Sequence, residues 1–308
     1  MFVMMNAARY AVGMQGIAVA ERAYQLAAAY AKERVQGRPV DGSLPGAGPI
    51  IHHPDVKRML LTMRSMTEGC RALALAAAAE YDHAHAHPDA AQRQRSQAAY
   101  EFLVPLLKGF STEMSLEVAS LGVQVHGGMG FIEETGAAQY LRDAKILSIY
   151  EGTTAIQAND LVGRKTARDG GAVARAFAAQ IEATEGALRS SGSAAALAMA
   201  RRLAEGRQAF LDVVAFVVER VRADPNAAFA GSVPYLLLAG NLAAGWQLAR
   251  ALLVAERKLA AGEDAAFMRN KIAVARFYAE HVLTRVPGLR DSVVDGAAAV
   301  TELPAEMF

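Results

Sequence analysis

Apolar residues recur at helical spacing in every long segment of this chain, whereas the alternation typical of a strand is scarce. In the first segment, from about Asn6 to Glu33, the recurring apolar positions are Val12, Ile17, Val19, Tyr24, Leu26 and Tyr30. A spacing of three to four residues places such side chains on one face of an α-helix. Alanine is abundant and the 308 residues contain only 10 prolines, which also favours helix. We therefore predict an all-α fold.

Glycine, proline and capping residues divide the chain into successive predicted helices. Before the turn at Asp169-Gly170-Gly171, these helices cover about 6–33, 54–81, 91–125, 135–147 and 153–164. After it they cover Ala172–Arg189, Ala194–Ala223, Val233–Ala261 and Ala265–Arg285, followed by an irregular or loosely packed tail, Pro287–Phe308. Long helices with short links indicate antiparallel bundles. We expect two helical bundles, one in residues 1–168 and a second in residues 169–308.

Charge and cysteine content argue against several classes of function. The 32 basic and 31 acidic residues leave a net charge of +1, without a basic stripe suited to nucleic acid. The single cysteine, Cys70, excludes an intrachain disulfide framework and a thiolate zinc site, and its Ala/Leu-rich surroundings predict a buried thiol. His83, His85 and His87 alternate in a polar link that matches no known zinc pattern, so we predict no metal site.

We predict neither a membrane span nor a secretory leader. No stretch approaches the roughly 20 apolar residues that cross a bilayer. Residues 1–5 are apolar but lack the basic region and the cleavage site of a signal peptide. The expected location is therefore the cytoplasm.

The segment Gln124–Gln157 carries the most chemical information. It contains a glycine-rich helix end, an Arg-Asp pair, and a carboxylate, Glu151, just before a predicted helix start. Apolar neighbours predict partial burial of Glu151, which would raise its pKa toward that of a general base. Judged locally, Glu151 can instead simply balance the positive end of a helix dipole. Thr154 and Gln157 have the spacing of a capping box, in which both side chains satisfy free backbone N–H groups.

The ordered strings VQVHGGMGF, LRDAKI and IYEGTTAIQ resemble the carboxy-terminal signature of acyl-CoA dehydrogenases. In that family the order is Gln-x-x-Gly-Gly-x-Gly, then Arg-Asp-Ala, then Tyr-Glu-Gly-Thr. A second match, Glu33-Arg34-Val35-Gln36-Gly37, ends the first predicted helix, as the family's Glu-Arg-x-x-Gly motif does. The resemblance covers roughly residues 3–165. The remainder resembles the additional helical domain of longer members, including those acting on 3-methylmercaptopropionyl-CoA.

The resemblance implies that Glu151 is the catalytic base, which takes the α-proton of an acyl-CoA while a hydride passes from the β-carbon to FAD. The residues it implies for acyl-CoA binding are Asn6, Arg9, Tyr150 and Gly152. The residues it implies for FAD binding are Arg34, Gln124, Gly127, Gly128, Thr153 and Gln157. Structural roles remain open for several of them: Arg34 as a cation at a helix C-terminus, the two glycines as a helix end, and Gln157 as a cap.

The resemblance further implies a trans-2-enoyl-CoA product, electron-transfer flavoprotein as the acceptor, and a homo-oligomer that shares its flavin sites. Full-length relatives carry an amino-terminal helical domain and a middle β-domain, and neither is present in this sequence. We therefore expect a fragment or subunit of a flavin-dependent dehydrogenase. The alternative is a non-catalytic helical oligomerisation unit left by truncation. The preferred acyl chain is not indicated by the sequence.

Overall fold

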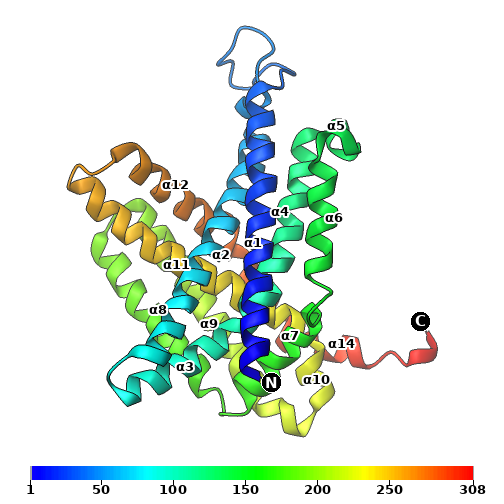
Figure 1. Cartoon of the computed structure of the whole chain (residues 1–308), viewed down its shortest axis with the longest axis vertical. Coiled ribbons are helices and arrows are strands. Elements are labelled where there is room, and N and C mark those ends of the chain that lie inside the picture. The colour runs from blue at the N-terminus through cyan, green and yellow to red at the C-terminus, as the bar shows by residue number, and fades with distance from the viewer. Residues whose placement is uncertain (1, 308) are drawn as a thin grey trace.

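The computed structural model describes residues 2–307, and no strand occurs within that range, so the predicted all-α fold is confirmed (Figure 1). The first seven α-helices are α1 (Phe2–Glu33), α2 (Pro54–Ala86), α3 (Ala90–Pro105), α4 (Ser111–His126), α5 (Gly128–Phe131), α6 (Ala137–Leu147) and α7 (Thr154–Asp160). The following helices are α8 (Ala172–Ser191), α9 (Ala194–Ala223), α10 (Pro225–Ala230), α11 (Ser232–Ala260), α12 (Ala265–His281), α13 (Val286–Val294) and α14 (Ala297–Thr301).

The first bundle is built around α1, which packs along α4, α2 and α6 (Figure 1). We predicted one helix over 91–125, whereas α3 and α4 are joined there by a π-helical segment, Leu106–Phe110. Pro105 lies at this junction, where its missing N–H and its ring disturb a regular α-helix. The widened turn brings a lysine, Lys108, into the interior.

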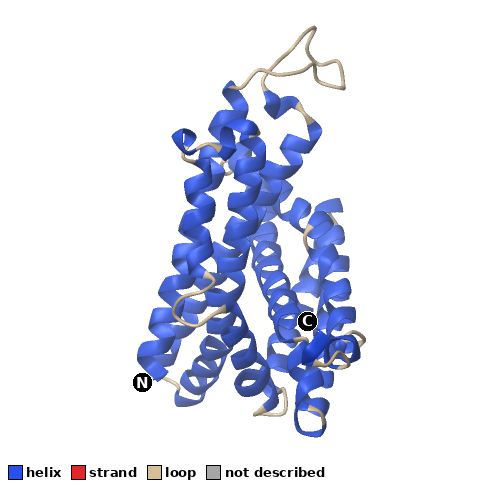
Figure 2. Ribbon diagram, turned by 90° about the vertical axis from the view of Figure 1, so that its right-hand side faces the viewer, coloured by secondary structure: helices blue, strands red, loops and turns tan. Residues whose placement is uncertain are grey.

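A loop of residues 34–49 connects α1 to η1, a short 3-10 helix of residues 50–52, at one end of this bundle (Figure 2). The loop is fixed by hydrogen bonds from Gln36 N to Gly48 O at 3.0 Å and from Ile50 N to Arg34 O at 2.8 Å. The His53 ring Nε2 lies 2.8 Å from the Gln36 carbonyl oxygen. These contacts hold Arg34 close to the end of α1.

The second bundle contains α8, α9, α11, α12 and α13, and one continuous hydrophobic core joins it to the first bundle. Its central helix, α11, is long and apolar enough to cross a membrane by length and composition, which the sequence analysis overlooked. However, 72% of its most apolar window is buried against other helices of the described chain. This burial is typical of the core helix of a folded domain.

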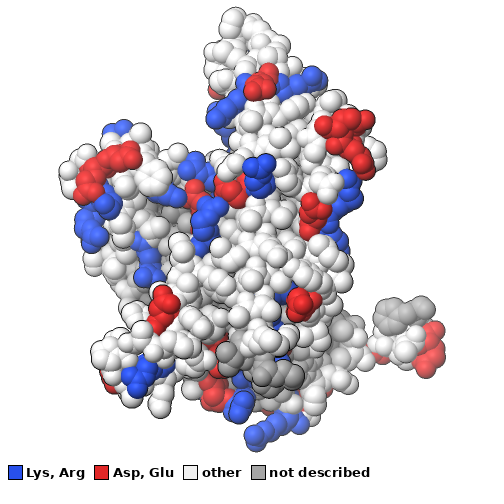
Figure 3. All heavy atoms as spheres, in the orientation of Figure 1, with Lys and Arg blue, Asp and Glu red and all other residues white. Residues whose placement is uncertain are grey.

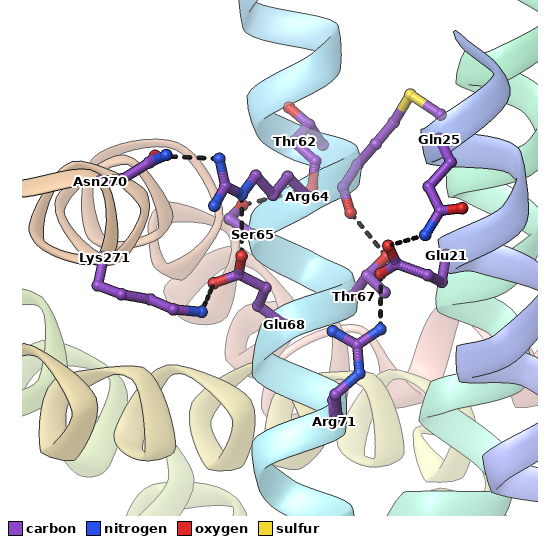
Figure 4. A network of polar contacts seen from close by, with 11 residues as sticks. Glu21, Gln25, Thr62, Arg64, Ser65, Thr67, Glu68, Arg71, Asn270 and Lys271 are labelled. Carbon is purple, nitrogen blue, oxygen red and sulfur yellow. Dashed lines mark hydrogen bonds and ion pairs between the residues drawn. The ribbon is translucent and has the colours of Figure 1, made fainter. Parts of the chain in front are cut away.

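Polar contacts also connect the two bundles (Figure 4). Arg64 on α2 donates to Glu68 at 2.8 Å and to Asn270 on α12 at 3.0 Å. Lys271 donates to the other carboxylate oxygen of Glu68 at 2.8 Å. Because these residues come from both sides of the predicted boundary at 168/169, the bundles pack as one body, and the boundary itself stays a prediction.

The predicted irregular tail was wrong for residues 287–294, which belong to the helix Val286–Val294. This helix, α13, packs against α9 and α11, with Val286 and Val293 each 0% exposed. Beyond α14 the described chain extends away from the body (Figure 1). Phe308 lies outside the described residues. Pro287 suits the first turn of a helix, so its presence did not exclude one.

The histidine-rich region differs from the prediction because α2 continues to Ala86 instead of ending near Tyr81. His83 and His85 therefore lie in the last helical turn, and the His85 ring Nδ1 lies 2.8 Å from the Tyr81 carbonyl oxygen. Cys70, in the same helix, is buried as predicted, and burial raises the pKa of its thiol to about 12. That thiol remains protonated at neutral pH.

The crossing of α11 over the π-helical segment requires a glycine at position 240. A Cβ atom there would lie 2.2 Å from Phe110 Cγ, far inside van der Waals contact. We expect Gly240→Ala to lower the free energy of unfolding by about 3 kcal/mol, because Phe110 is buried and has little space to move. Urea denaturation measures this change.

Gly186→Ala on α8 is the matched control. Nothing lies within 4 Å of a Cβ at position 186, and the glycine is exposed in mid-helix. Alanine there should raise stability by about 0.5–1 kcal/mol. Equal effects of the two substitutions would contradict the tight crossing.

Candidate active site

The segment that carries Glu151 is a short connection, residues 148–153, between α6 and α7. Glu151 has φ 52° and Gly152 has φ 87°, so two successive residues occupy the left-handed region. A non-glycine residue there is strained, and such strain concentrates at functional sites. The connection is closed by hydrogen bonds from Tyr150 N to Ile146 O at 3.0 Å and from Thr154 N to Ser148 O at 3.1 Å.

The helix that follows is capped by Thr153, not by the predicted capping box. Thr153 Oγ1 accepts a hydrogen bond from Ile156 N at 3.3 Å, whereas the Thr154 hydroxyl donates to the Glu113 carboxylate on α4. Gln157 is fully buried and its amide donates to the Gly152 carbonyl oxygen at 3.4 Å. The local spacing suggested a capping box, but the Thr154 hydroxyl instead makes a tertiary hydrogen bond to Glu113 on α4.

Glu151 is exposed, so the predicted partial burial of this carboxylate is wrong for the described chain. Of its apolar neighbours Leu147 is buried, but three isoleucines lie at the surface: Ile146 is 53%, Ile149 48% and Ile156 48% exposed. The Tyr150 hydroxyl donates to Gln15 on α1, which links the segment to the first helix. The base candidate thus stands on an open, partly apolar surface rather than in a closed pocket.

Lys108 lies beneath the Glu151 segment and was missed by the sequence analysis. Its side chain is 0% exposed, and its ammonium donates to Leu147 O at 2.8 Å and Gly152 O at 2.6 Å. Burial lowers the pKa of Lys108 to about 8. The signal that could have indicated a buried charge was a lone lysine in the otherwise apolar run LVPLLKGF.

The first helix reaches α7 through an ion pair. Arg9 is 7% exposed, and its guanidinium contacts the Asp160 carboxylate at 2.6 Å. Asp160 also contacts Arg164 at 2.6 Å. Asn6, one turn before Arg9, is half-buried. The structure thus places Asn6 and Arg9 at the same end of the bundle as Glu151, and their binding of acyl-CoA stays a prediction.

Four other predicted residues converge at the opposite end of the first bundle. Arg34, Gln124, Gly127 and Gly128 line one pocket of about 410 Å³, between the ends of α1 and α4. The rings of Tyr30 and His126 in its wall stack with centroids 4.3 Å apart. Gly127 has φ 62°, and nothing lies within 4 Å of a Cβ on either glycine, so the backbone is open to a ligand. An arginine beside exposed backbone suits the phosphates of FAD.

The two clusters lie at opposite ends of α4 (Figure 1). The 16 residues of α4 correspond to a rise of about 24 Å. Glu151, Thr153 and Gln157 therefore belong to one cluster, and the Arg34 pocket forms another. The predicted FAD-binding residues of one chain are divided between two separate surfaces.

Comparison with known proteins identifies the family. Residues 2–165 match the family model described as "Acyl-CoA dehydrogenase, C-terminal domain". The chain belongs to the acyl-CoA dehydrogenase family. Residues 177–304 match a second model, "Acetyl-CoA dehydrogenase C-terminal like", and this second match covers most of the second bundle.

Curated relatives agree with this family. The chain is 59% identical to 3-methylmercaptopropionyl-CoA dehydrogenase of Ruegeria pomeroyi, over 96% of this chain and 50% of the relative. It is 34% identical to a broad-specificity linear acyl-CoA dehydrogenase of Mycobacterium tuberculosis, over 100% of this chain and 52% of the relative. The chain thus spans about half the length of the curated relatives it matches.

The fold is shared with an acyl-CoA dehydrogenase from Bacillus anthracis, solved in complex with FAD. That match has a TM-score of 0.73 and 19% identity, and covers 99% of this chain and 50% of the solved chain. The structure of Caenorhabditis elegans ACDH-11 in complex with C11-CoA gives a TM-score of 0.70 at 20% identity, over 95% and 47% of the two chains. At these identities the likeness concerns the fold alone.

Proposed function

We propose that this chain supplies the base-bearing part of a flavin-dependent dehydrogenase that converts an acyl-CoA to a trans-2-enoyl-CoA, with Glu151 as the base. The observation that carries the proposal is the geometry of Glu151: an exposed carboxylate at φ 52°, on a segment held from beneath by Lys108. The names of the two relatives compared above support this reaction class.

In the proposed mechanism the Glu151 carboxylate accepts the α-proton of the thioester. The α-proton is only weakly acidic, so the thioester oxygen must accept hydrogen bonds as negative charge develops on it, and the backbone N–H of Glu151 is the donor that this chain contributes. FAD, when bound, supplies the redox chemistry by accepting the hydride from the β-carbon. Tyr150 and Gly152 flank the base and border the acyl-CoA.

The separation of the two clusters supports a shared flavin site. The Glu151 cluster would face the reactive part of one FAD together with Thr153 and Gln157, whose buried Oε1 has no partner within the described chain. The Arg34 pocket, about one α4 length away, would then hold the phosphate and adenine part of a second FAD, bound mainly by a partner copy. A homo-oligomer follows from this arrangement. We further propose electron-transfer flavoprotein as the acceptor and a cytoplasmic location.

Lys and Arg are scattered among Asp and Glu over the face shown in Figure 3, most of which is formed by other residues. A surface of mixed sign attracts neither polyanions nor polycations over long distances. The guanidinium in the Arg34 pocket therefore contributes more to the attraction of a phosphate group than the net charge of +1 does.

A joined protein tests the flavin part of this proposal. It consists of the amino-terminal half of the Ruegeria pomeroyi relative followed by this chain from Met1. After incubation with FAD and gel filtration it should retain flavin absorbance. Arg34→Ala should weaken FAD binding about ten-fold, because a charged hydrogen bond to phosphate is lost.

Arg38→Ala, an exposed arginine of the adjacent loop, is the control and should leave FAD binding unchanged. A joined protein that folds and assembles but stays colourless would contradict the proposal. That result would instead support the non-catalytic oligomerisation unit.

A further inference from the structure

Lys108 is an unusual buried charge, because nothing in the hydrophobic core requires an ammonium group. It lies in the π-helical segment among Leu106, Leu107 and Phe110, each no more than 2% exposed. Burying an isolated ammonium is strongly unfavourable unless hydrogen bonds replace its lost water. The hydrogen bonds of Lys108 therefore indicate the structural role of its charge.

The two hydrogen bonds of the ammonium go to backbone carbonyls on either side of Glu151. Leu147 is the last residue of α6, and its carbonyl oxygen accepts at 2.8 Å. The Gly152 carbonyl oxygen, directly after the base candidate, accepts at 2.6 Å. Carbonyls at a helix end and in a tight connection lack regular helical partners. One ammonium thus bridges the two ends of the stretch that contains Glu151.

The bridge is charged at neutral pH. Burial is the largest influence and lowers the pKa of Lys108 to about 8, while Glu113 and Glu151 favour the ammonium and Arg9 opposes it. These three groups come from α4, the segment itself and α1. Hydrogen bonds from a charged donor are stronger than those from a neutral amine. The bridge should therefore weaken as pH rises through about 8.

We propose that Lys108 is the positioning residue of the base: its buried ammonium ties Leu147 O to Gly152 O and so holds Glu151 in the left-handed conformation. The assignment rests on the proposed function for its catalytic meaning, whereas the tether itself is a property of the fold. Lys108 does not touch the reacting atoms. It acts through the backbone on which the base is carried.

Hydrogen exchange of the 308-residue chain tests the tether without requiring turnover. Lys108→Met keeps the length of the side chain and removes its donors. We expect amides of residues 148–154 to exchange at least about ten-fold faster, whereas residues 124–130 at the other end of α4 keep their wild-type rates. Unchanged exchange in residues 148–154 of a folded variant would overturn the proposal.

Lys165→Met is the matched control. Lys165 also lies in a π-helical segment, residues 161–167, but its ammonium pairs with Glu101 at 2.9 Å instead of with the segment. This variant should leave exchange in residues 148–154 at the wild-type rate. Equal acceleration in both variants would mean a general loosening of the bundle and would contradict a specific role for Lys108.

A second measurement does not depend on a variant that folds. In the wild-type chain, exchange of residues 148–154, corrected for intrinsic pH dependence, should accelerate between about pH 7 and about pH 9.5 as Lys108 loses its charge. Residues 124–130 serve as the internal reference. Parallel behaviour of both regions across this range would overturn the proposal.

Turnover of the joined protein separates this inference from the proposed function. With Lys108→Met we expect kcat to fall about ten- to one hundred-fold and KM to change less than about three-fold, because the base is displaced while acyl-CoA contacts remain. A wild-type kcat in Lys108→Met with faster exchange would overturn the catalytic role of the tether. Failure of the proposed function would appear differently, because Glu151→Gln would then turn over at the wild-type rate. The exchange result would still stand in that case.

Discussion

Replacing Glu151 by glutamine is expected to lower turnover of acyl-CoA by about three orders of magnitude in the joined protein. The amide has nearly the same shape as the carboxylate but cannot accept the α-proton. The left-handed conformation at φ 52° is no more costly for glutamine than for glutamate, so the segment should keep its structure. KM for acyl-CoA should change little, because the base contributes mainly to the transition state.

Steady-state assays with an artificial electron acceptor measure this effect. Glu134→Gln is the control: Glu134 is an exposed carboxylate between α5 and α6, away from residues 148–153, and its loss should leave turnover unchanged. Undiminished turnover of Glu151→Gln would show that another group takes the proton. Glu113, which accepts from Thr154 beside the segment, is then the next carboxylate to replace.

The second large effect concerns the pair of Arg9 and Asp160. Both side chains are less than one-tenth exposed, and Asp160→Asn would leave the Arg9 charge buried without its counter-ion. We expect the free energy of unfolding to fall by about 3 kcal/mol, since breaking a buried pair from one side is strongly unfavourable. Adding Arg9→Met should recover much of that loss, because the unpaired charge is then removed as well.

Chemical denaturation of the two single variants and the double variant measures the coupling between the two positions. Glu101→Gln, which breaks the more exposed pair with Lys165, should cost less than about 1 kcal/mol. Additive effects of Arg9→Met and Asp160→Asn would contradict the buried pair. In that case Arg9 would be free to contact acyl-CoA, as the family resemblance implies.

Helices were predictable wherever local pattern and end signals agree. The helix Ala194–Ala223 was predicted with its observed bounds, because Ser193 caps its start and Asp224-Pro225 begins the next helix. The predicted Val233–Ala261 differs from α11 by one residue at each end. In such segments apolar spacing and capping are encoded within a few neighbouring residues, so tertiary contacts are not needed to locate the helix.

The missed features all depend on contacts between distant segments. The π-helical turn at 161–167 has no local signature, and the only local sign of the turn at 106–110 is Pro105. Lys108 was overlooked because its carbonyl partners lie about 40 residues further along the chain. The Thr154 hydroxyl binds Glu113 rather than capping α7 for the same reason. Residues 287–294 were judged irregular although they belong to α13, whose two buried valines pack on α9 and α11.

The sequence names the residues of the candidate site, whose roles stay predictions, but not their arrangement. The ordered glycine-rich and Tyr-Glu-Gly-Thr strings identified both clusters, yet nothing local shows that they lie at opposite ends of α4. Sequence also predicted partial burial of Glu151 from its apolar neighbours, whereas those isoleucines lie at the surface. Apolar residues beside a functional carboxylate indicate a surface that a ligand or another part of the protein can cover.

The most direct test is anaerobic addition of acyl-CoA to the FAD-loaded joined protein, followed by flavin absorbance. The proposed function predicts that the oxidised flavin band disappears on mixing, and that it persists in Glu151→Gln although acyl-CoA still binds. A wild-type flavin that stays oxidised after acyl-CoA of several chain lengths has bound would contradict the role of this chain as the base-bearing part of a dehydrogenase.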